Sequence, residues 1–521
     1  MERGRAGSIK RAGLLALALS VMLAAGATSA SAVLVRLHNG TSVSYKPLRG
    51  STAAVSPLDR VFSDVDYNGG PVMASNTDYA FYWDPAGAPA YPAEYQQGID
   101  QYFTDLAHDS GGHENTDSVA TQYDDAAGEF ANYESHFGGA IIDTDPYPAN
   151  GCDRAPICIT DEQIQAELSK YLVAHELPED LAHEYFLLTP PGVEDCFEAA
   201  GRECSAGSKR PVYCAYHSDV ELGGGAVIVY ANDPFVTGIE GCDDGNHPNG
   251  KPSDGALEGG LSHEHLESIT DPEPNSAWAN ISEGGSEIGD KCEESMGTPL
   301  GVAADGAFYN QIIDGHFYWY QEEWSNQGHQ CLQRLSFSGE RPTATFTSTS
   351  QSNTQATFDA SGSSAPGGVA EYNWQFNNGP GGSLGKPIET TSPTITRTFR
   401  GKGPFLVALT VFASDGTSSG TAHTVTISKP PPPTVTQVSP ATGPRTGGTL
   451  VTVTGSGFTL GAGATSFKFG KALASEVRCA TSSSCTMLAP AASKAGAVDV
   501  IAKVGKASSR KDRPADEFTY A

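Results

Sequence analysis

The chain has 521 residues, with 61 acidic against 32 basic side chains and a formal net charge of −29. This length exceeds what one hydrophobic core supports, so several domains are expected. The strong negative charge argues against binding nucleic acid through its phosphates. It suits an exported protein whose acidic groups form a solvated surface or bind divalent cations.

Residues 1–32 have the pattern of a signal peptide. Basic residues near the N-terminus precede an apolar stretch from Leu14 to Ala25, and Ala30-Ser31-Ala32 fits the small-residue rule for cleavage. A membrane anchor is the alternative, but the apolar stretch is shorter than a membrane-spanning helix requires. We therefore predict a secreted, extracellular protein with no transmembrane segment in the mature chain.

All ten cysteines follow the predicted cleavage site, and an even number in an exported chain predicts disulfides. Proximity suggests Cys152–Cys158 and Cys479–Cys485, and Cys292–Cys331 would close a loop. The other two bridges would form among Cys196, Cys204, Cys214 and Cys242, whose pairing stays open. A zinc–thiolate site fits less well because no two cysteines have C-x-x-C spacing.

Residues 33–335 mix helical and strand patterns, which predicts an α/β or α+β domain. Residues 79–83, 184–188 and 226–230 are expected to be strands, and apolar residues recur at helical spacing over 93–106. Thr160 and Gln163 form a capping box for a helix that runs to about Ala174. The aromatic residues of these segments are expected in the core.

The segment from Ser262 to Asp271 is the main candidate for chemistry, and it is expected to be a helix that ends before Pro272. His263 and Glu267 are four positions apart, so they share one face and could bind zinc. Glu264 would then lie beside a metal-bound water and act as the general base. This is the logic of the H-E-x-x-H metalloprotease helix, except that Glu267 replaces the second His.

A third metal ligand is expected downstream, in the segment Glu287-Ile288-Gly289-Asp290-Lys291-Cys292. Asp290 is the first choice, and Glu287, His265 and His217 are the alternates. A Cys292–Cys331 bridge would hold this segment rigid, as a metal site requires. The competing interpretation treats His263 and Glu267 as an ordinary helix-surface pair. Glu264, Glu267 and Asp271 would then be a solvated acidic face.

A loop with Asp243, Asp244, Asn246 and Asp254 is either a calcium site or a polar surface turn. It lacks the ligand spacing of an EF-hand, and its composition is typical of turns. The chain contains no Gly-Lys-Ser/Thr phosphate loop, and Gly-x-Ser-x-Gly occurs only at 381–385 and 416–420, in the part of the chain whose pattern is all-β rather than strand-turn-helix. This argues against nucleotide hydrolysis and α/β-hydrolase chemistry.

Composition changes near Ser336, where Thr, Ser, Val and Gly become frequent and the pattern becomes all-β. Residues 429–433 form a proline-rich linker between modules at 338–428 and 434–521, each the size of a small sandwich. Tyr372, Trp374 and Phe376 alternate and should share one sheet face. In the second module Val451 and Val453 should alternate inward.

Several segments resemble known families. The stretch from Phe358 to Ser364, the aromatic strand and the strand at 407–411 resemble a PKD domain. The segments 438–444 and 447–458 resemble an IPT/TIG domain, an immunoglobulin-like sandwich. These families usually act as spacers or binding modules, which is what the resemblance implies for the tail.

The front part also carries a resemblance, in the Ser-His-Glu-x-x-Glu-x-x-Thr-Asp-Pro run, the Glu-Ile-Gly-Asp-x-Cys run and the Cys-Ala-Tyr-His segment. Together they are similar to secreted bacterial proteins with a zincin-like core and, more distantly, to plant phosphate-induced (EXORDIUM-like) extracellular proteins. The resemblance implies a metal site at His263 and Glu267.

Two functional hypotheses follow. The first is a secreted zinc-dependent hydrolase, a metallopeptidase or a derivative of one. Its tail modules would hold it near an extracellular polymer, a cell wall or a partner protein surface. The alternative is a non-catalytic extracellular binding or cell-surface protein with a degenerate metal site. The intact His263-Glu264 pair favours the enzyme, and Glu267 in place of His favours the binding protein.

Overall fold

The computed structural model describes residues 34–49, 63–222, 225–293, 295–335, 341–350, 354–377, 379, 382, 384–400, 403–414, 416–428, 431–461 and 463–521. The predicted signal peptide and the start of the predicted proline-rich linker lie outside these residues. Contacts divide the chain into two compact units. The first is Met1–Gly339 with Gly416–Ser418, and the second is Glu340–Asp415 with Ser419–Ala521. The chain is multidomain and rich in β-structure.

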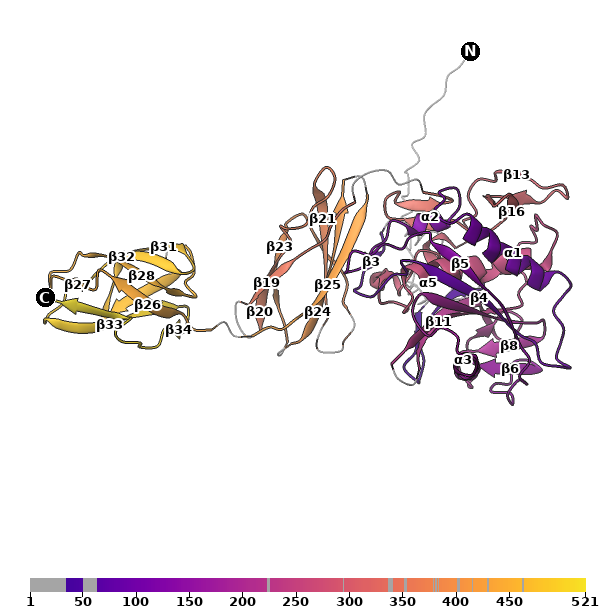
Figure 1. Ribbon diagram of the computed structural model, residues 1–521, viewed down its shortest axis with the longest axis horizontal. Helices are drawn as coiled ribbons and strands as arrows, with labels where there is room; N and C mark the ends of the chain where they lie inside the picture. Colours follow the sequence, from indigo (N-terminus) through magenta and orange to yellow (C-terminus); the bar gives the residue numbers. More distant parts are fainter. Residues whose placement is uncertain are drawn as a thin grey trace, which may run out of the picture. The chain divides into compact units, whose positions relative to one another are not determined.

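A ten-stranded mixed sheet forms the centre of the first unit (Figure 1). Eight strands follow one another across it: β5 (Ser135–Asp143), β4 (Asn76–Trp83), β7 (His183–Thr189), β11 (Val227–Pro234), β10 (Pro211–Glu221), β9 (Cys204–Ser205), β8 (Val193–Cys196) and β6 (Ile157–Thr160). The first four strands of this order run parallel, and β10 is antiparallel to β11. β2 (Ser42–Pro47) pairs with β10, and β1 (Leu34–Arg36) pairs with β2.

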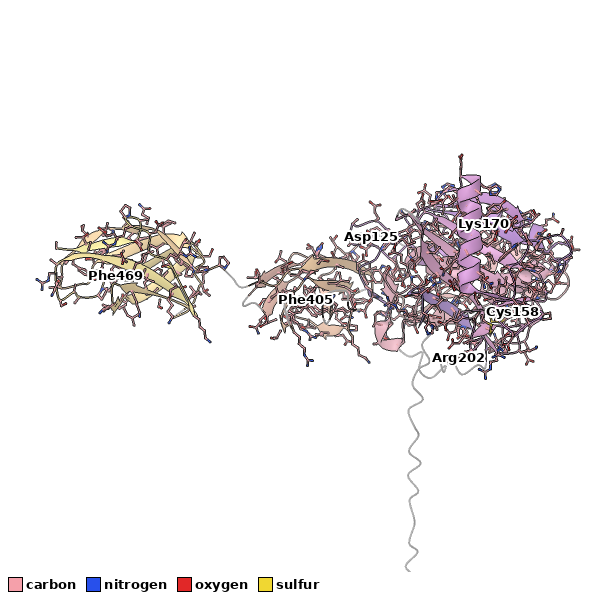
Figure 2. The ribbon with its side chains drawn as sticks, turned by 90° about the horizontal axis from the view of Figure 1, so that it is seen from below. Asp125, Cys158, Lys170, Arg202, Phe405 and Phe469 are labelled. Carbon is pink, nitrogen blue, oxygen red and sulfur yellow. A yellow bond between two sulfur atoms is a disulfide. The ribbon has the colours of Figure 1, made fainter. Side chains whose placement is uncertain are left out.

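Helices cover both faces of this sheet, because β4 and β7 carry apolar side chains on both sides. Ala80 and Tyr82 of β4 pack with α1 (Tyr95–His108), whereas Phe81 and Trp83 pack with α3 (Asp161–His175). The predicted capping box begins α3, and Lys170 lies on this helix (Figure 2). Among the described residues, no helix is long and apolar enough to cross a membrane.

One buried segment runs through α4 (Pro252–Ala256), a π-helical turn (Leu257–Leu261) and α5 (Ser262–Thr270). Gly260 lets the turn approach β10 closely, because a Cβ there would lie 2.2 Å from the Cβ of Ala215. Such π-turns are frequent at functional sites. Every residue of α5 is buried. The solvated acidic face is therefore wrong, since Glu264, Glu267 and Asp271 are each 0% exposed.

Short elements complete the first unit. They are α2 (Asp117–Ala120), the pair β3 (Asp66–Tyr67) and β12 (Trp278–Ala279), the 3-10 turns η2 (Ile281–Glu283) and η3 (Asp290–Cys292), and the hairpins β13 (Gly301–Val302)–β14 (Phe308–Tyr309), β15 (Gln311–Ile313)–β16 (His316–Tyr318) and β17 (Glu323–Ser325)–β18 (Gln330–Leu332).

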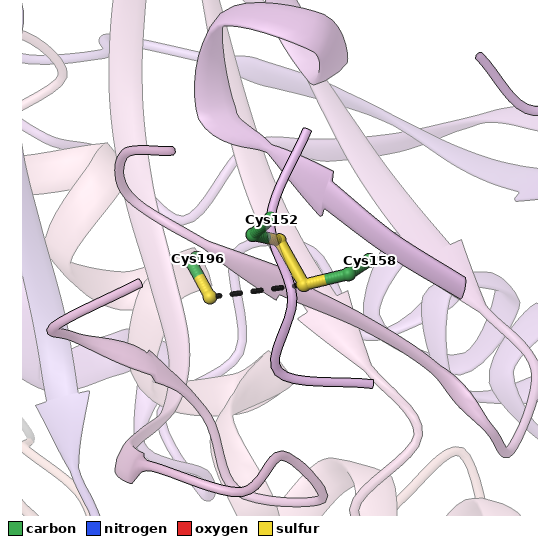
Figure 3. Close-up of side chains that lie close together, drawn as sticks. All are labelled: Cys152, Cys158 and Cys196. Atoms are coloured by element: carbon green, nitrogen blue, oxygen red, sulfur yellow. Dashed lines mark hydrogen bonds between the residues drawn. A yellow bond between two sulfur atoms is a disulfide. The ribbon is translucent and has the colours of Figure 1, made fainter. Parts of the chain in front are cut away.

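The ten cysteines form five disulfides: Cys152–Cys158, Cys196–Cys204, Cys214–Cys242, Cys292–Cys331 and Cys479–Cys485. The three pairings expected from the sequence are among them. Cys196 lies beside the Cys152–Cys158 bridge, with its Sγ 3.9 Å from Sγ of Cys158 (Figure 3). Since all three sulfurs are committed to disulfides, they do not form a thiolate metal site.

The second unit contains two β-sandwich modules. The first pairs β19 (Thr347–Ser350), β20 (Gln355–Asp359) and β23 (Thr394–Thr398) in one sheet. Its other sheet holds β22 (Ile388–Thr390), β21 (Val369–Phe376), β24 (Phe405–Ala413) and β25 (Ser418–Val425). Tyr372, Trp374 and Phe376 of β21 all enter one core, as their alternation predicts.

In the second module, one sheet holds β26 (Thr434–Ser439), β28 (Leu450–Ser456), β32 (Ser484–Leu488) and β31 (Ser475–Thr481). The other holds β27 (Thr442–Gly443), β35 (Glu517–Tyr520), β33 (Gly496–Val504), β29 (Thr465–Phe469), β30 (Ala472–Leu473) and β34 (Ala507–Ser508). Val451 and Val453 of β28 are fully buried in its core. Figure 2 labels Phe405 of the first module and Phe469 of this one.

Candidate metal centre

The structure brings five of the predicted metal ligands together. His263 and Glu267 come from α5, Asp290 opens η3, Glu287 precedes it, and His217 comes from β10. We call these five residues the His263 cluster. The side chains come from three separate parts of the chain, and all are buried.

The geometry of His263, Glu267 and Asp290 suits one metal ion. The Nε2 atom of His263 lies 3.2 Å from Oε1 of Glu267 and 3.8 Å from Oδ1 of Asp290. Bonds of about 2 Å in a tetrahedral zinc site place ligand atoms roughly 3.3 Å apart. These three side chains therefore stand close to the spacing that one zinc ion requires.

Gln321 sets the tautomer of His263. Its Oε1 lies 3.2 Å from Nδ1 of the imidazole, and its Nε2 donates to the carbonyl of Gly289 at 2.9 Å. The second bond fixes the amide orientation, so Oε1 accepts a hydrogen bond from Nδ1–H. The lone pair of His263 is then on Nε2, facing Glu267 and Asp290. Burial also lowers the pKa of His263, which favours this neutral form.

His217 and Glu287 form a second group of possible ligands that shares Glu267. The Nδ1 atom of His217 lies 3.7 Å from Oε2 of Glu267, and its Nε2 lies 3.6 Å from Oε2 of Glu287. Burial lowers the pKa of His217 as well. These two side chains thus form a group of their own, which Glu267 connects to the group at His263.

Electrostatics favour a cation at this cluster. Burial raises the pKa of Glu267 to about 7. Burial and, next, the charge of Glu267 raise the pKa of Asp290 to about 8. Among the described residues, His263 Nε2 and Asp290 Oδ1 have no hydrogen-bond partner although both are buried, whereas Glu267 Oε1 accepts from the backbone N–H of Asp290. Buried charges normally pair or bind metals, so the donor set fits a divalent ion.

The segment 287–292, which carries Asp290, packs closely against α5. A Cβ on Gly289 would lie 2.8 Å from both Nδ1 of His263 and Oε1 of Glu267, so a larger residue there would force these side chains to move. The backbone N–H of Asp290 donates to Oε1 of Glu267 at 2.9 Å. The Cys292–Cys331 disulfide ties the end of this segment to β18.

Glu264, the predicted general base, is engaged by the protein. Its Oε2 lies 3.1 Å from Nδ1 of His217, and its Oε1 accepts from the backbone N–H of Lys46 at 3.0 Å. Its side chain is 0% exposed, and burial raises its pKa well above the ordinary value. No surface of Glu264 is open to a substrate.

His265 does not join the His263 cluster. It projects from α5 in another direction, and its Nε2 lies 3.3 Å from Oδ1 of Asp117. As an alternate ligand for the site at His263 it is wrong, because residues two apart on a helix face nearly opposite sides.

The acidic loop at 243–254 satisfies its own carboxylates. Asp243 accepts from the backbone N–H groups of Gly238 and Gly245, at 2.6 and 2.7 Å. Asp254 accepts from the N–H of Asn249 at 3.0 Å. These bonds are typical of a turn, so its geometry does not call for calcium.

Sequence reasoning missed Gln321 and Lys46 at the centre. Gln321 is 58 positions from His263, and Lys46 is 218 from Glu264. Neither residue lies in a recognisable motif. A buried lysine or glutamine becomes informative only once its neighbours are known.

Family models match the tail of the chain. Residues 339–428 match the PKD domain model, and residues 433–520 match the IPT/TIG domain model. Both tail resemblances are therefore confirmed. The zincin-like and EXORDIUM-like resemblances of the front part have no matching family model and remain predictions. No curated protein matches the chain.

Solved structures give matches of low similarity. The PKD1 domain of Vibrio anguillarum Epp is 19% identical, with 18% of this chain and 100% of that chain covered and a TM-score of 0.15. The plexin A4 extracellular region is 14% identical, with 35% of this chain and 18% of that chain covered and a TM-score of 0.21. SGBP-B from a Bacteroides uniformis xyloglucan utilization locus is 16% identical, with 33% of this chain and 46% of that chain covered and a TM-score of 0.20. The chain thus spans less than half of the last two proteins.

Proposed function

We propose that this protein is a secreted, non-catalytic binding or adhesion protein whose N-terminal domain is stabilised by a buried zinc ion. The ion would be held by His263, Glu267 and Asp290, beside the group that His217 and Glu287 form with Glu267. Structural zinc sites are closed by protein ligands, whereas catalytic sites keep a position open for water and substrate.

Burial of the whole site carries this proposal. His263, Glu264, Glu267 and Glu287 are 0% exposed and Asp290 is 2% exposed. A peptidase must bring a peptide bond within about 3 Å of its metal-bound water and its general base. Glu264 instead bonds to His217 and to the backbone of Lys46.

The tail supports the binding role. PKD and IPT/TIG modules occupy residues 339–428 and 433–520, and the described residues contain five disulfides. Disulfides persist in oxidising compartments, which agrees with export. The modules would hold the N-terminal domain at an extracellular polymer, a cell wall or a partner protein surface.

The test combines zinc content, thermal unfolding and proteolysis. The purified full chain should contain zinc, and removing it with a chelator should lower the melting temperature. A substitution at Glu264 to glutamine keeps the size of the side chain. It should retain zinc, because Glu264 is not a ligand in this proposal.

Peptidase assays against a mixed peptide library decide between the two functions. We expect no cleavage above background by the wild type. Zinc-dependent cleavage that the chelator abolishes, and that Glu264→Gln loses while keeping its zinc, would establish the hydrolase instead. A chain that folds without zinc and does not take it up would contradict the metal proposal.

A further inference from the structure

A second buried group of ligand atoms lies on the other side of α5. Asp78 of β4 and Glu184 of β7 are directly opposite each other in the parallel register of these strands. Their side chains lie on the α1 face, on the side of Ala80 and Phe186. Like charges opposite each other destabilise a sheet, so this pair requires a compensating group.

His265 approaches this pair of carboxylates. Its Nδ1 atom lies 3.4 Å from Oε2 of Glu184 and 3.8 Å from Oδ1 of Asp78. One ligand atom from each of the three residues lies within 4.8 Å of the others. This spacing is close to the roughly 3.3 Å between ligand atoms of a tetrahedral zinc site.

Asp117 of α2 orients the imidazole. Its Oδ1 accepts a hydrogen bond from Nε2–H of His265 at 3.3 Å. With Nε2 engaged by Asp117, Nδ1 is the ring nitrogen that faces Asp78 and Glu184. The rings of Phe103 and Phe186 pack against the imidazole, at centroid distances of 6.2 and 5.8 Å. A carboxylate behind a histidine is the usual support for a metal ligand.

Two of these three described residues aim unpartnered atoms into this space, whereas both carboxylate oxygens of Asp78 accept from Nδ2 of Asn76 at 2.9 Å. Among the described residues, His265 Nδ1 and both carboxylate oxygens of Glu184 have no hydrogen-bond partner. His265 and Glu184 are 0% exposed, and Asp78 and Asp117 are each 1% exposed. The carboxylate of Glu184 and the Nδ1 atom of His265, which have no hydrogen-bond partner in the described part of the chain, each carry a desolvation cost that a bound cation would offset.

We propose that Asp78, Glu184 and His265 form a second divalent-cation site, separate from the His263 cluster, and that Asp117 is its positioning residue. One imidazole nitrogen with two carboxylates at this spacing selects zinc rather than calcium, because calcium takes six to eight oxygen ligands. The ion ties β4, β7 and α5 together in the core. This site does not depend on the zinc site at His263 or on the proposed function.

Zinc counting on the full chain tests the proposal. The purified protein is loaded with Zn²⁺, desalted and analysed by mass spectrometry of its metals. We expect two zinc ions per chain in the wild type. His265→Gln and His263→Gln are matched variants on one helix. Each should keep one ion, and the double variant should keep none.

Anomalous X-ray scattering at the zinc edge locates the ions in wild-type crystals and does not depend on a variant's folding. A peak beside Nδ1 of His265 would support the site. Zinc at the His263 cluster with none at His265 would overturn this inference and leave the other site intact. A peak at His265 alone would support this inference and remove the proposed site at His263. No peak at either would overturn both.

The positioning role of Asp117 can be tested separately, by the zinc affinity of Asp117 variants. Replacing it with Ala should weaken zinc affinity at this site by about 10–100-fold in chelator competition, and Asp117→Asn, which keeps an acceptor oxygen, should restore part of it. Unchanged affinity at this site in folded Asp117→Ala would overturn the positioning role.

Discussion

His263 and His265 stand two positions apart on α5, and each has the supporting partner that a metal ligand needs. Gln321 accepts from Nδ1 of His263, and Asp117 accepts from Nε2 of His265. The two imidazoles therefore direct opposite nitrogens at their carboxylates. One short helix thus presents candidate metal ligands to both of its sides, which is possible because the whole helix is buried.

Gly289 is the residue whose replacement should damage the first site most directly. In Gly289→Ala, the new Cβ would meet His263 and Glu267 at 2.8 Å. We expect a loss of about 1–3 kcal/mol in unfolding free energy, as in overpacked cores, and weaker zinc binding. Denaturant unfolding and chelator competition measure the two effects.

Gly385→Ala is the matched control for this prediction. Its Cβ would meet the carbonyl oxygen of Phe376 at 3.5 Å, an ordinary contact. It should leave zinc binding unchanged. If Gly289→Ala binds zinc as tightly as this control, the close approach at Gly289 does not support the site.

The site at His263 requires a fixed position of the segment that ends in η3 relative to α5. The backbone of Asp290 donates to Glu267, and the backbone of Trp324 donates to the carbonyl of Ile288 at 3.0 Å. The Cys292–Cys331 bridge connects the same segment to the strand that pairs with β17.

The double substitution Cys292→Ala with Cys331→Ala tests this bracing. Removing a native disulfide commonly costs about 2–5 kcal/mol, and here it also frees the segment that carries Asp290. We expect lower unfolding free energy and faster loss of zinc to a chelator. Cys479→Ala with Cys485→Ala removes a bridge within the IPT/TIG domain and should leave zinc loss unchanged. Equal rates in the two double variants would contradict the prediction.

For the whole molecule, the buried carboxylates make stability depend on both pH and zinc. The pKa values of Glu267 and Asp290 rise from 4.5 to about 7 and from 3.8 to about 8. The metal-free folded protein thus holds protons that the unfolded chain releases. The contribution of Glu267 and Asp290 to the free energy of unfolding should therefore be greatest below about pH 4–5. It should fall by a few kcal/mol as the pH rises to about 8.

The stabilisation by bound zinc should increase with pH, because zinc binds the deprotonated ligands. The increase in melting temperature on adding zinc should therefore be larger at pH 7.5 than at pH 5.5. Thermal unfolding with zinc and with chelator, at both pH values, measures it. The variant carrying Glu267→Gln and Asp290→Asn should lose most of the difference. A zinc effect that does not change with pH would argue against these ligands.

Local features were predictable from the sequence because they depend on neighbours within a few positions. The capping box at Thr160 begins α3, the alternation of Tyr372, Trp374 and Phe376 places them in one core, and His263 and Glu267 share a face of α5. The tail motifs also sufficed to predict the PKD and IPT/TIG domains.

Tertiary structure decided which side chains meet and which are exposed. His217, Gln321 and Asp117 come from distant segments, and strand order and packing bring them to α5. The polar residues of α5 suggest a solvent-facing side, yet the surrounding elements bury all of it. The sequence alone thus determined the local elements and the candidate ligands. Burial is a collective property of the fold, so only the fold separated the two histidine clusters and closed both to solvent.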